Sequence, residues 1–107
     1  MTDPGRLNQR LVLEVPVEAA DGAGGVVRSF EAGPLLWAAV EPVAARGEVV
    51  AAGAGATVTH RILVRAGLAI TTRHRLRKGA RLFRIVAVRE EDSSGRFLVI
   101  DAEERRD

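Results

Sequence analysis

Basic side chains are concentrated in one stretch of this sequence. Residues 57–89 contain eight Arg and one Lys without any Asp or Glu, a formal charge of +9, whereas the other 74 residues contain seven Arg and 14 acids, a charge of −7. Arg forms paired, salt-sensitive hydrogen bonds with carboxylates and with phosphates. We therefore expect this segment to contact an acidic protein surface or DNA, the alternative being an ordinary solvated strand face. The expected contact residues are Arg61, Arg65, Arg73, Arg75, Arg77, Lys78 and Arg81.

Groups that could carry out catalysis are few and scattered. The chain has two His, three Ser and no Cys, and its carboxylates form no recognisable group with them. Catalysis needs such groups within hydrogen-bond reach of one another, and no His or carboxylate spacing is typical of a metal site. We therefore predict that the protein is not an enzyme and has no catalytic residue, cofactor or metal. His60 is expected in the core or an interface, and His74 on the surface of the basic segment.

Alternation of apolar and polar residues predicts short strands. Leu11, Leu13, Val15 and Val17 fall on one face of residues 10–18, as in a half-buried strand. The glycines of residues 21–25 predict a hairpin turn, because glycine accepts the positive φ values of such turns. The Gly-Pro pair at positions 33 and 34 is expected to break the chain between two strands. The predicted strands cover residues 10–18, 26–31, 35–43, 57–65, 82–89 and 96–101, with a further short strand or turn at 70–77.

These elements predict an all-β fold. Six or so short strands joined by turns, without any segment of helical period, are typical of an antiparallel barrel or sandwich. We favour a small antiparallel β-barrel of about six strands, because closure removes the exposed edges of Val-rich strands. One domain is expected over residues 1–107, with a charged tail at 104–107 that frays. The sole Trp, Trp37, is expected in the core, the alternative being a hot spot of a contact between subunits.

Chain length and the distribution of apolar residues limit the protein's surroundings. A chain of 107 residues buries only about two-thirds of its unfolded surface, so assembly into an oligomer would help it. The longest run without a charged side chain, residues 49–60, has 12 residues, fewer than the roughly 20 apolar residues that cross a bilayer. The first ten residues lack the apolar core of a signal peptide. We therefore expect no membrane partner and an intracellular location.

Residues 44–56 differ in composition from everything around them. Their sequence, AARGEVVAAGAGA, carries just two charges and ends in Ala and Gly, which predicts at most a short helix leading into a loop. A connection between two strands needs only about 2 to 5 residues, so the extra length calls for a role. The residues expected to matter in this long Ala/Gly-rich loop are Arg46, Glu48, Val49, Val50, Gly53 and Gly55.

The chain contains an ordered set of short motifs. They are GRL at residues 5–7 with Arg10, DGAGGVV at 21–27 with Phe30, WAAVEP at 37–42, Arg46 with Glu48, THRI at 59–62 with Arg65, and FRI at 83–85. Each motif alone is weak, but their order and spacing over residues 5–103 resemble the head-tail joining family of tailed phages, whose members are also called head-closure or stopper proteins.

This resemblance implies a fold and a function. The family fold is a small β-barrel with one long loop. Its members form rings, with six copies expected, in the neck between the portal side of a DNA-filled head and the tail. Similar proteins occur in phage-like gene transfer agent particles. The implied partners are copies of the same chain, a portal-side adaptor ring, a tail terminator protein and the double-stranded DNA in the channel. The implied location is the cytoplasm during assembly and then the virion neck.

The sequence allows two interpretations of the loop and two of the whole protein. In stopper proteins the loop projects into the channel and helps to retain or gate the packaged DNA, which a flexible loop of small residues suits. It could equally pack on a neighbouring subunit. The alternative to a structural ring protein is a stand-alone nucleic-acid-binding β-barrel that uses the basic segment 57–89 to hold backbone phosphates.

Overall fold

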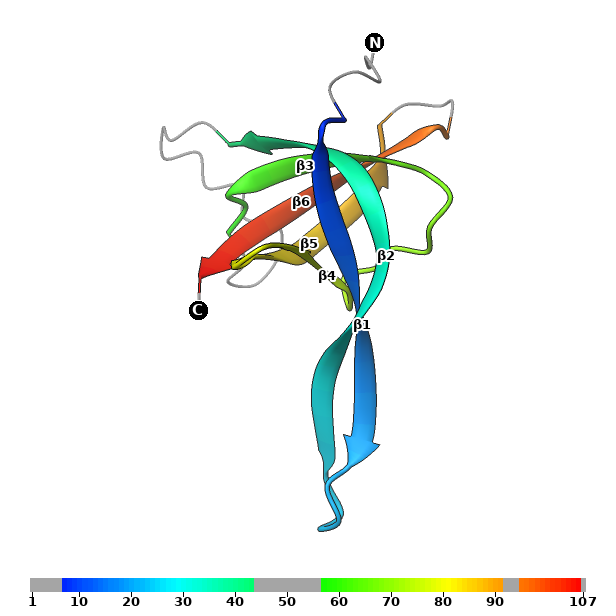
Figure 1. Ribbon diagram of the computed structural model, residues 1–107, viewed down its shortest axis with the longest axis vertical. Helices are drawn as coiled ribbons and strands as arrows, with labels where there is room; N and C mark the ends of the chain where they lie inside the picture. Colours follow the sequence, from blue (N-terminus) through cyan, green and yellow to red (C-terminus); the bar gives the residue numbers. More distant parts are fainter. Residues whose placement is uncertain (1–6, 44–56, 92–94, 107) are drawn as a thin grey trace.

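The computed structural model of this chain is a closed barrel of six antiparallel strands (Figure 1). The structure describes residues 7–43, 57–91 and 95–106. Around the barrel the strands follow the order β1-β2-β3-β6-β5-β4, and β4 pairs with β1 to close the ring. This confirms the predicted all-β antiparallel barrel. The strands are β1 (Gln9–Ala20), β2 (Val26–Pro42), β3 (His60–Arg65), β4 (Arg75–Lys78), β5 (Arg81–Glu90) and β6 (Phe97–Arg106).

Strand β2 runs without interruption through the Gly33-Pro34 pair, so the predicted break there is wrong. The register pairs Val12 with Leu35 and Glu14 with Ala32, which leaves Gly33 and Pro34 together opposite Leu13. This is a β-bulge, and it accommodates a proline that cannot donate a ladder hydrogen bond. A Cβ on Gly33 would lie 2.6 Å from the Leu13 carbonyl oxygen. The pair therefore bends the strand instead of ending it.

Beyond this bulge, β1 and β2 continue as a two-stranded arm that leaves the barrel (Figure 1). We define the arm as residues 15–31; Pro16 to Ala20 pair there with Phe30 to Val26. The arm is the reason that the molecule extends 51 Å along one axis against 31 and 28 Å along the others. Its tip is the predicted hairpin turn, where the Asp21 carboxylate accepts hydrogen bonds from the amides of Ala23 at 2.7 Å and Gly25 at 2.9 Å.

One apolar core fills the barrel. Its members come from all six strands and include Leu11, Leu76, Phe83 and Ile100, each 0% exposed. The alternation predicted for β1 is correct, but the prediction that Val15 and Val17 are buried with Leu11 and Leu13 is not, since Val15 is 36% exposed and Val17 is half-buried. The reason is that β1 has left the barrel at this point, so no opposite wall covers these side chains.

The carboxyl end of the chain belongs to the barrel. Strand β6 runs to Arg106, and its last residues pair with the start of β5, Arg81 opposite Arg106 and Arg84 opposite Glu103. The expected end of this strand at residue 101 is therefore too early, and residues 104–106 are paired where a frayed tail was predicted. Opposite charges across the two strands favour this extension, because Arg81 and Glu104 form an ion pair at 2.8 Å.

Within the described part of the chain, no helix is long and apolar enough to cross a membrane.

Candidate functional site

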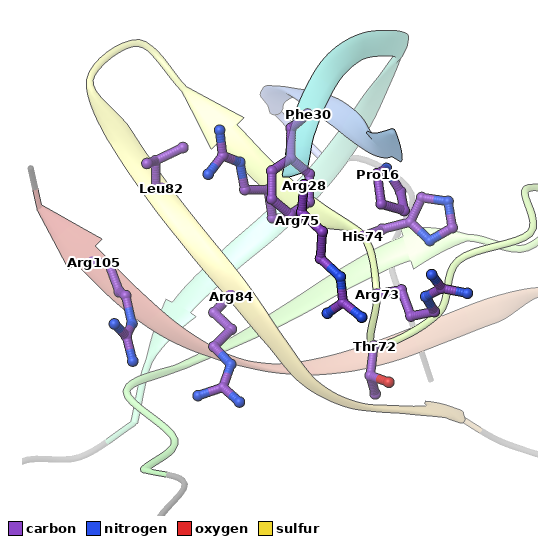
Figure 2. A pocket seen from close by; sticks show the side chains of 10 residues that line it. All are labelled: Pro16, Arg28, Phe30, Thr72, Arg73, His74, Arg75, Leu82, Arg84 and Arg105. Carbon is purple, nitrogen blue, oxygen red and sulfur yellow. The ribbon is translucent and has the colours of Figure 1, made fainter. Parts of the chain in front are cut away.

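An arginine-rich cleft lies where the arm meets the barrel (Figure 2). It has a volume of about 610 Å³, and its walls come from the arm, from the turn before β4, and from β4, β5 and β6. Five of its ten lining residues are Arg and none is Asp or Glu. The lining residues are Pro16, Arg28, Phe30, Thr72, Arg73, His74, Arg75, Leu82, Arg84 and Arg105. The residues that line the cleft therefore offer cationic donors and no carboxylate.

The inner end of the cleft is held by a buried carboxylate. Glu14 of β1 lies opposite Arg75 of β4 and is 6% exposed. It accepts hydrogen bonds from the Nε atoms of Arg75 and, at 2.8 Å, of Arg77. Burial alone would raise the pKa of Glu14, but the two guanidinium groups outweigh it, so the pKa lies below the usual 4.5. The Arg75 guanidinium also lies 4.0 Å from the centre of the Phe30 ring, which ties the arm to the barrel.

The outer end of the cleft has a second shared carboxylate. Glu18 of the arm contacts Arg28 across the hairpin at 3.2 Å and Arg73 of the turn before β4 at 2.9 Å. In that turn, the Nδ1 atom of His74 accepts a hydrogen bond from the Thr71 amide at 3.2 Å. Arg28 and Arg73 remain largely exposed, at 74% and 66% of their side chains, so both can also reach a ligand in the cleft.

The far wall of the cleft repeats the same arrangement. Glu103 of β6 contacts Arg84 at 3.9 Å and Arg105 at 3.3 Å, and both arginines line the cleft (Figure 2). Beside this wall, Glu104 pairs with Arg81 at 2.8 Å and with His60 at 3.7 Å. The hydrogen bond from Arg81 to Glu104 raises the pKa of Arg81.

The surface keeps a positive charge because each of three carboxylates is shared by two arginines. Glu14, Glu18 and Glu103 each contact two arginines, so each of these three groups keeps a net charge of +1. All three acids come from outside the basic segment 57–89. The separation of charge along the sequence is therefore not a separation in space, because antiparallel pairing places acidic residues of β1 and β6 beside the basic residues of β4 and β5.

The seven basic residues singled out from the sequence do not form one surface. Arg73 and Arg75 line the cleft, with Arg77 beside them on Glu14. Lys78 donates to the Gln9 side chain, and Arg81 pairs with Glu104. Arg61 and Arg65 lie on β3, which is separated from β4 by β6 and β5 around the barrel. There Arg61 contacts Asp101 at 3.6 Å, and the Arg65 guanidinium lies 5.8 Å from the centre of the Phe97 ring.

The cleft also contains residues that the sequence analysis did not single out. Arg84 lies within the basic segment but was left out of the expected contacts, and Arg28 and Arg105 lie far from it in sequence. Arg28 could have been found from the hairpin alone, since its register places it opposite Glu18. No sequence signal brings Arg105 to the cleft, because its place depends on the length of β6.

The predictions for the other residues named from the sequence differ in how well they agree with the structure. His60 is largely buried, with its ring 5.3 Å from that of Phe83 and its Nδ1 atom 2.9 Å from the Thr59 hydroxyl, as expected of a core histidine. The prediction that Trp37 is buried is wrong: it is 52% exposed, because it faces outward on β2 between Leu36 and Ala38, which face the core. The loop residues Arg46, Glu48, Val49, Val50, Gly53 and Gly55 lie outside the described residues.

No group of three or more His, Asp or Glu side chains is placed to hold a metal ion among residues 7–43, 57–91 and 95–106. The chemistry that the cleft offers is recognition of anions. Arginine forks bind planar carboxylates and phosphates with two hydrogen bonds each.

Comparison with known proteins gives a consistent result. Residues 2–105 match the family described as phage head completion protein. A chain of a solved structure described as the virion of a native gene transfer agent particle is 38% identical, with a TM-score of 0.73 over 94% of this chain and 97% of that one. A protein from Shigella flexneri 2a, solved in solution, is 28% identical, with a TM-score of 0.72 over 96% of both chains. No curated protein matches this chain.

Proposed function

The chain belongs to the phage head completion protein family, and on this basis we propose that it is a ring subunit of the neck that joins a DNA-filled head to a tail. Its family consists of structural proteins of virions, with no known enzyme activity. The observation that carries the proposal is the match over residues 2–105 together with a similar chain in a gene transfer agent virion. The proposed place of this chain is between a portal-side adaptor ring and the tail terminator protein, after assembly in the cytoplasm.

A ring is the assembly that suits this molecule best. The barrel is small, and its arm extends away from it, so one subunit has two distant surfaces that neighbours can use. Repetition of one head-to-tail contact closes into a ring when the rotation between subunits fits. We propose six copies, the number implied by the resemblance to stopper proteins.

The arginine cleft is proposed to bind an acidic segment of the adaptor ring or of the tail terminator. A static contact gains from arginine forks, which hold carboxylates with two hydrogen bonds. DNA in the channel has to slide, and dense Arg contacts with phosphate would oppose its release. Each carboxylate that is shared by two arginines leaves a net charge of +1 at the cleft. This small charge suits a partner segment with a few carboxylates better than it suits a long polyanion such as DNA.

Retention of DNA is assigned to the long loop. Its two ends leave the barrel side by side, since the Val43 amide donates to the Thr59 carbonyl at 2.8 Å and Pro42 pairs with His60. The two strand ends that flank residues 44–56 therefore lie at one edge of the barrel. In a ring, symmetric copies of this loop would meet near the axis and block the channel, with Val49 and Val50 in contact. This part of the proposal rests on the composition of the loop and on the family.

The stand-alone nucleic-acid-binding barrel is the weaker candidate. Its basis was a continuous basic surface from residues 57–89, and the structure divides these residues between β3 and the β4–β5 side of the barrel. Most of them are also paired with carboxylates, Arg61 and Arg89 with Asp101 among them. This division and pairing of the basic residues favour the neck role over the alternative.

A copy-number measurement tests the ring. Necks purified from particles that carry a tagged version of this chain would be weighed by native mass spectrometry. We expect several copies per neck, six if the resemblance holds in detail. One copy per neck, or absence of the chain from purified particles, would contradict the proposal. Salt-sensitive DNA binding by the isolated monomer would favour the alternative.

A further inference from the structure

The arm has one face that no other strand of the described part of the chain packs against, although Val17 on it is half-buried. Val15, Val17 and Ala19 point to this face from β1, and Val27 joins them from β2 because it pairs with Ala19. Val15 and Val27 are 36% and 54% exposed. The same face also carries Ser29, which pairs with Val17, and a single charged side chain, Glu31, opposite Val15. We call these six residues the valine face.

The valine face continues the inner side of β1. Leu11 and Leu13, four and two residues before Val15, are buried in the barrel core. The apolar alternation therefore goes on for three more residues of that face after the core has ended. The opposite face of the arm is different, since Pro16, Arg28 and Phe30 from it line the arginine cleft and contact the barrel. A two-stranded hairpin without a covered face is only marginally stable, so the valine face calls for a partner.

A second apolar surface lies on the outside of the barrel. Leu35 and Trp37 point outward from β2 and are 57% and 52% exposed. Val12 lies opposite Leu35, and Arg10 lies opposite Trp37 with its guanidinium 5.5 Å from the centre of the indole ring. We call these four residues the tryptophan patch. A large, rigid aromatic side chain beside an arginine is the composition that interface hot spots favour.

We propose that the valine face of one subunit docks on the tryptophan patch of a second copy of this chain. The proposal rests on the ring proposed above and names the contact that builds it. Both surfaces are mainly apolar, and each has one charged residue of opposite sign, Glu31 on the arm and Arg10 on the patch. Every subunit carries both surfaces once, which is what a head-to-tail contact requires.

The two surfaces cannot meet within one chain. Val27 and Leu35 lie on the same continuous strand, eight residues apart, which corresponds to about 26 Å at the usual rise of an extended strand. The valine face also continues the inner side of β1, whereas the tryptophan patch lies on the outer side of β1 and β2. Contact between them therefore needs two molecules.

Disulfide trapping tests this contact cleanly, because the chain has no Cys. The test variant carries Val27→Cys and Leu35→Cys, and the control carries Val26→Cys and Leu35→Cys. Val26 is also exposed, at 61%, but points to the opposite face of the arm. Both variants would be incorporated into particles, oxidised and separated by non-reducing electrophoresis. We expect a ladder of multiples of this chain from the test variant and at least tenfold less from the control.

The outcomes separate this inference from the proposed function. Particles that contain the test variant but give no ladder, or that give equal ladders from both variants, overturn the arm contact and leave the neck role standing. A link to a different particle protein also overturns it. Absence of the chain from particles made with the unaltered protein contradicts the neck role itself.

A charge exchange gives a second measurement that does not depend on disulfide geometry. Glu31→Arg would place two cations together at the proposed contact, and so we expect at least tenfold fewer tailed particles. Adding Arg10→Glu to the same chain restores an opposite pair and should recover most of the loss. No loss from Glu31→Arg, or a loss that Arg10→Glu deepens, would contradict the contact.

Discussion

Glu14 on β1 and Arg75 on β4 lie opposite each other at the point where the barrel closes, although 61 residues separate them in the sequence. The carboxylate is almost fully buried and holds two guanidinium groups, and one of these stacks on Phe30 of the arm. One ion-pair group thus fixes the closing strand pair, the direction of the arm and the inner end of the cleft.

Loss of the Glu14 charge should therefore weaken the whole fold. Glu14→Gln keeps the shape of the side chain but leaves Arg75 and Arg77 without a counter-charge in a partly buried place. We expect a loss of about 1 to 3 kcal/mol in the free energy of unfolding, measured by urea denaturation. Glu18→Gln is the matched control, and because Glu18 is more exposed we expect at most about 1 kcal/mol from it. Equal losses from the two variants would contradict this role of burial.

Stability should fall as the pH drops through the range where His60 titrates. Burial lowers the pKa of His60 below its usual 6.5, with Glu104 opposing this shift and Arg81 adding to it. The unfolded chain therefore takes up this proton more readily than the folded one. The contribution of His60 is full above pH 6.5, is lost as the pH falls below it, and levels off under the folded pKa.

Urea midpoints at pH 7.5, 6.5 and 5.5 measure this dependence. His60→Gln removes the titrating group, so the fall between pH 6.5 and 5.5 should shrink. The carboxylate of Glu14 cannot explain a change in this range, because its pKa lies below 4.5. An unchanged fall in the His60→Gln protein would show that another group is responsible.

Charge reversal in the cleft should prevent attachment of tails. Arg84→Glu removes an exposed cleft arginine that does not contact the buried Glu14. It places two carboxylates opposite each other at Glu103, so we expect the fold to persist with a loss of at most about 1 kcal/mol. We expect the yield of tailed particles to fall at least tenfold, which corresponds to a loss of about 1.4 kcal/mol in binding free energy. Arg65→Glu makes the same change on β3, outside the cleft, and should alter the yield by less than twofold. Similar yields from both variants would exclude the cleft as the partner site.

The long loop can be tested by shortening it. Replacing residues 44–56 by a four-residue turn that contains Gly should leave the fold intact, because Val43 and Thr59 already hold the two strand ends together. If the loop retains DNA, rings still form but filled heads lose DNA before tails attach, and packaged DNA can be measured by nuclease protection. Failure of the shortened chain to enter the neck would instead identify the loop as a contact between subunits.

Local patterns in the sequence were enough to predict much of this protein. Period-two alternation, as in Leu11 and Leu13 or Ile62 and Val64, identified the strands and most of the core. The glycines after Asp21 identified the arm's turn. Such features depend on neighbours a few residues away, so they are readable without the fold. The family was recognisable for a related reason, since its motifs are short strings in a fixed order.

Only the tertiary structure determined which residues from distant segments are in contact. Antiparallel closure placed Glu14 and Glu103 beside arginines of β4 and β5, which turned a basic segment into mostly paired charges and one cleft. The departure of β1 and β2 from the barrel left Val15 uncovered, and a bulge turned Gly33 and Pro34 from a strand end into a bend. The residue type of Trp37 predicts a place in the core. It is exposed because its neighbours Leu36 and Ala38 occupy the inner side of β2. Burial and charge pairing depend on contacts between distant segments, and the order of residues along one strand does not contain those contacts.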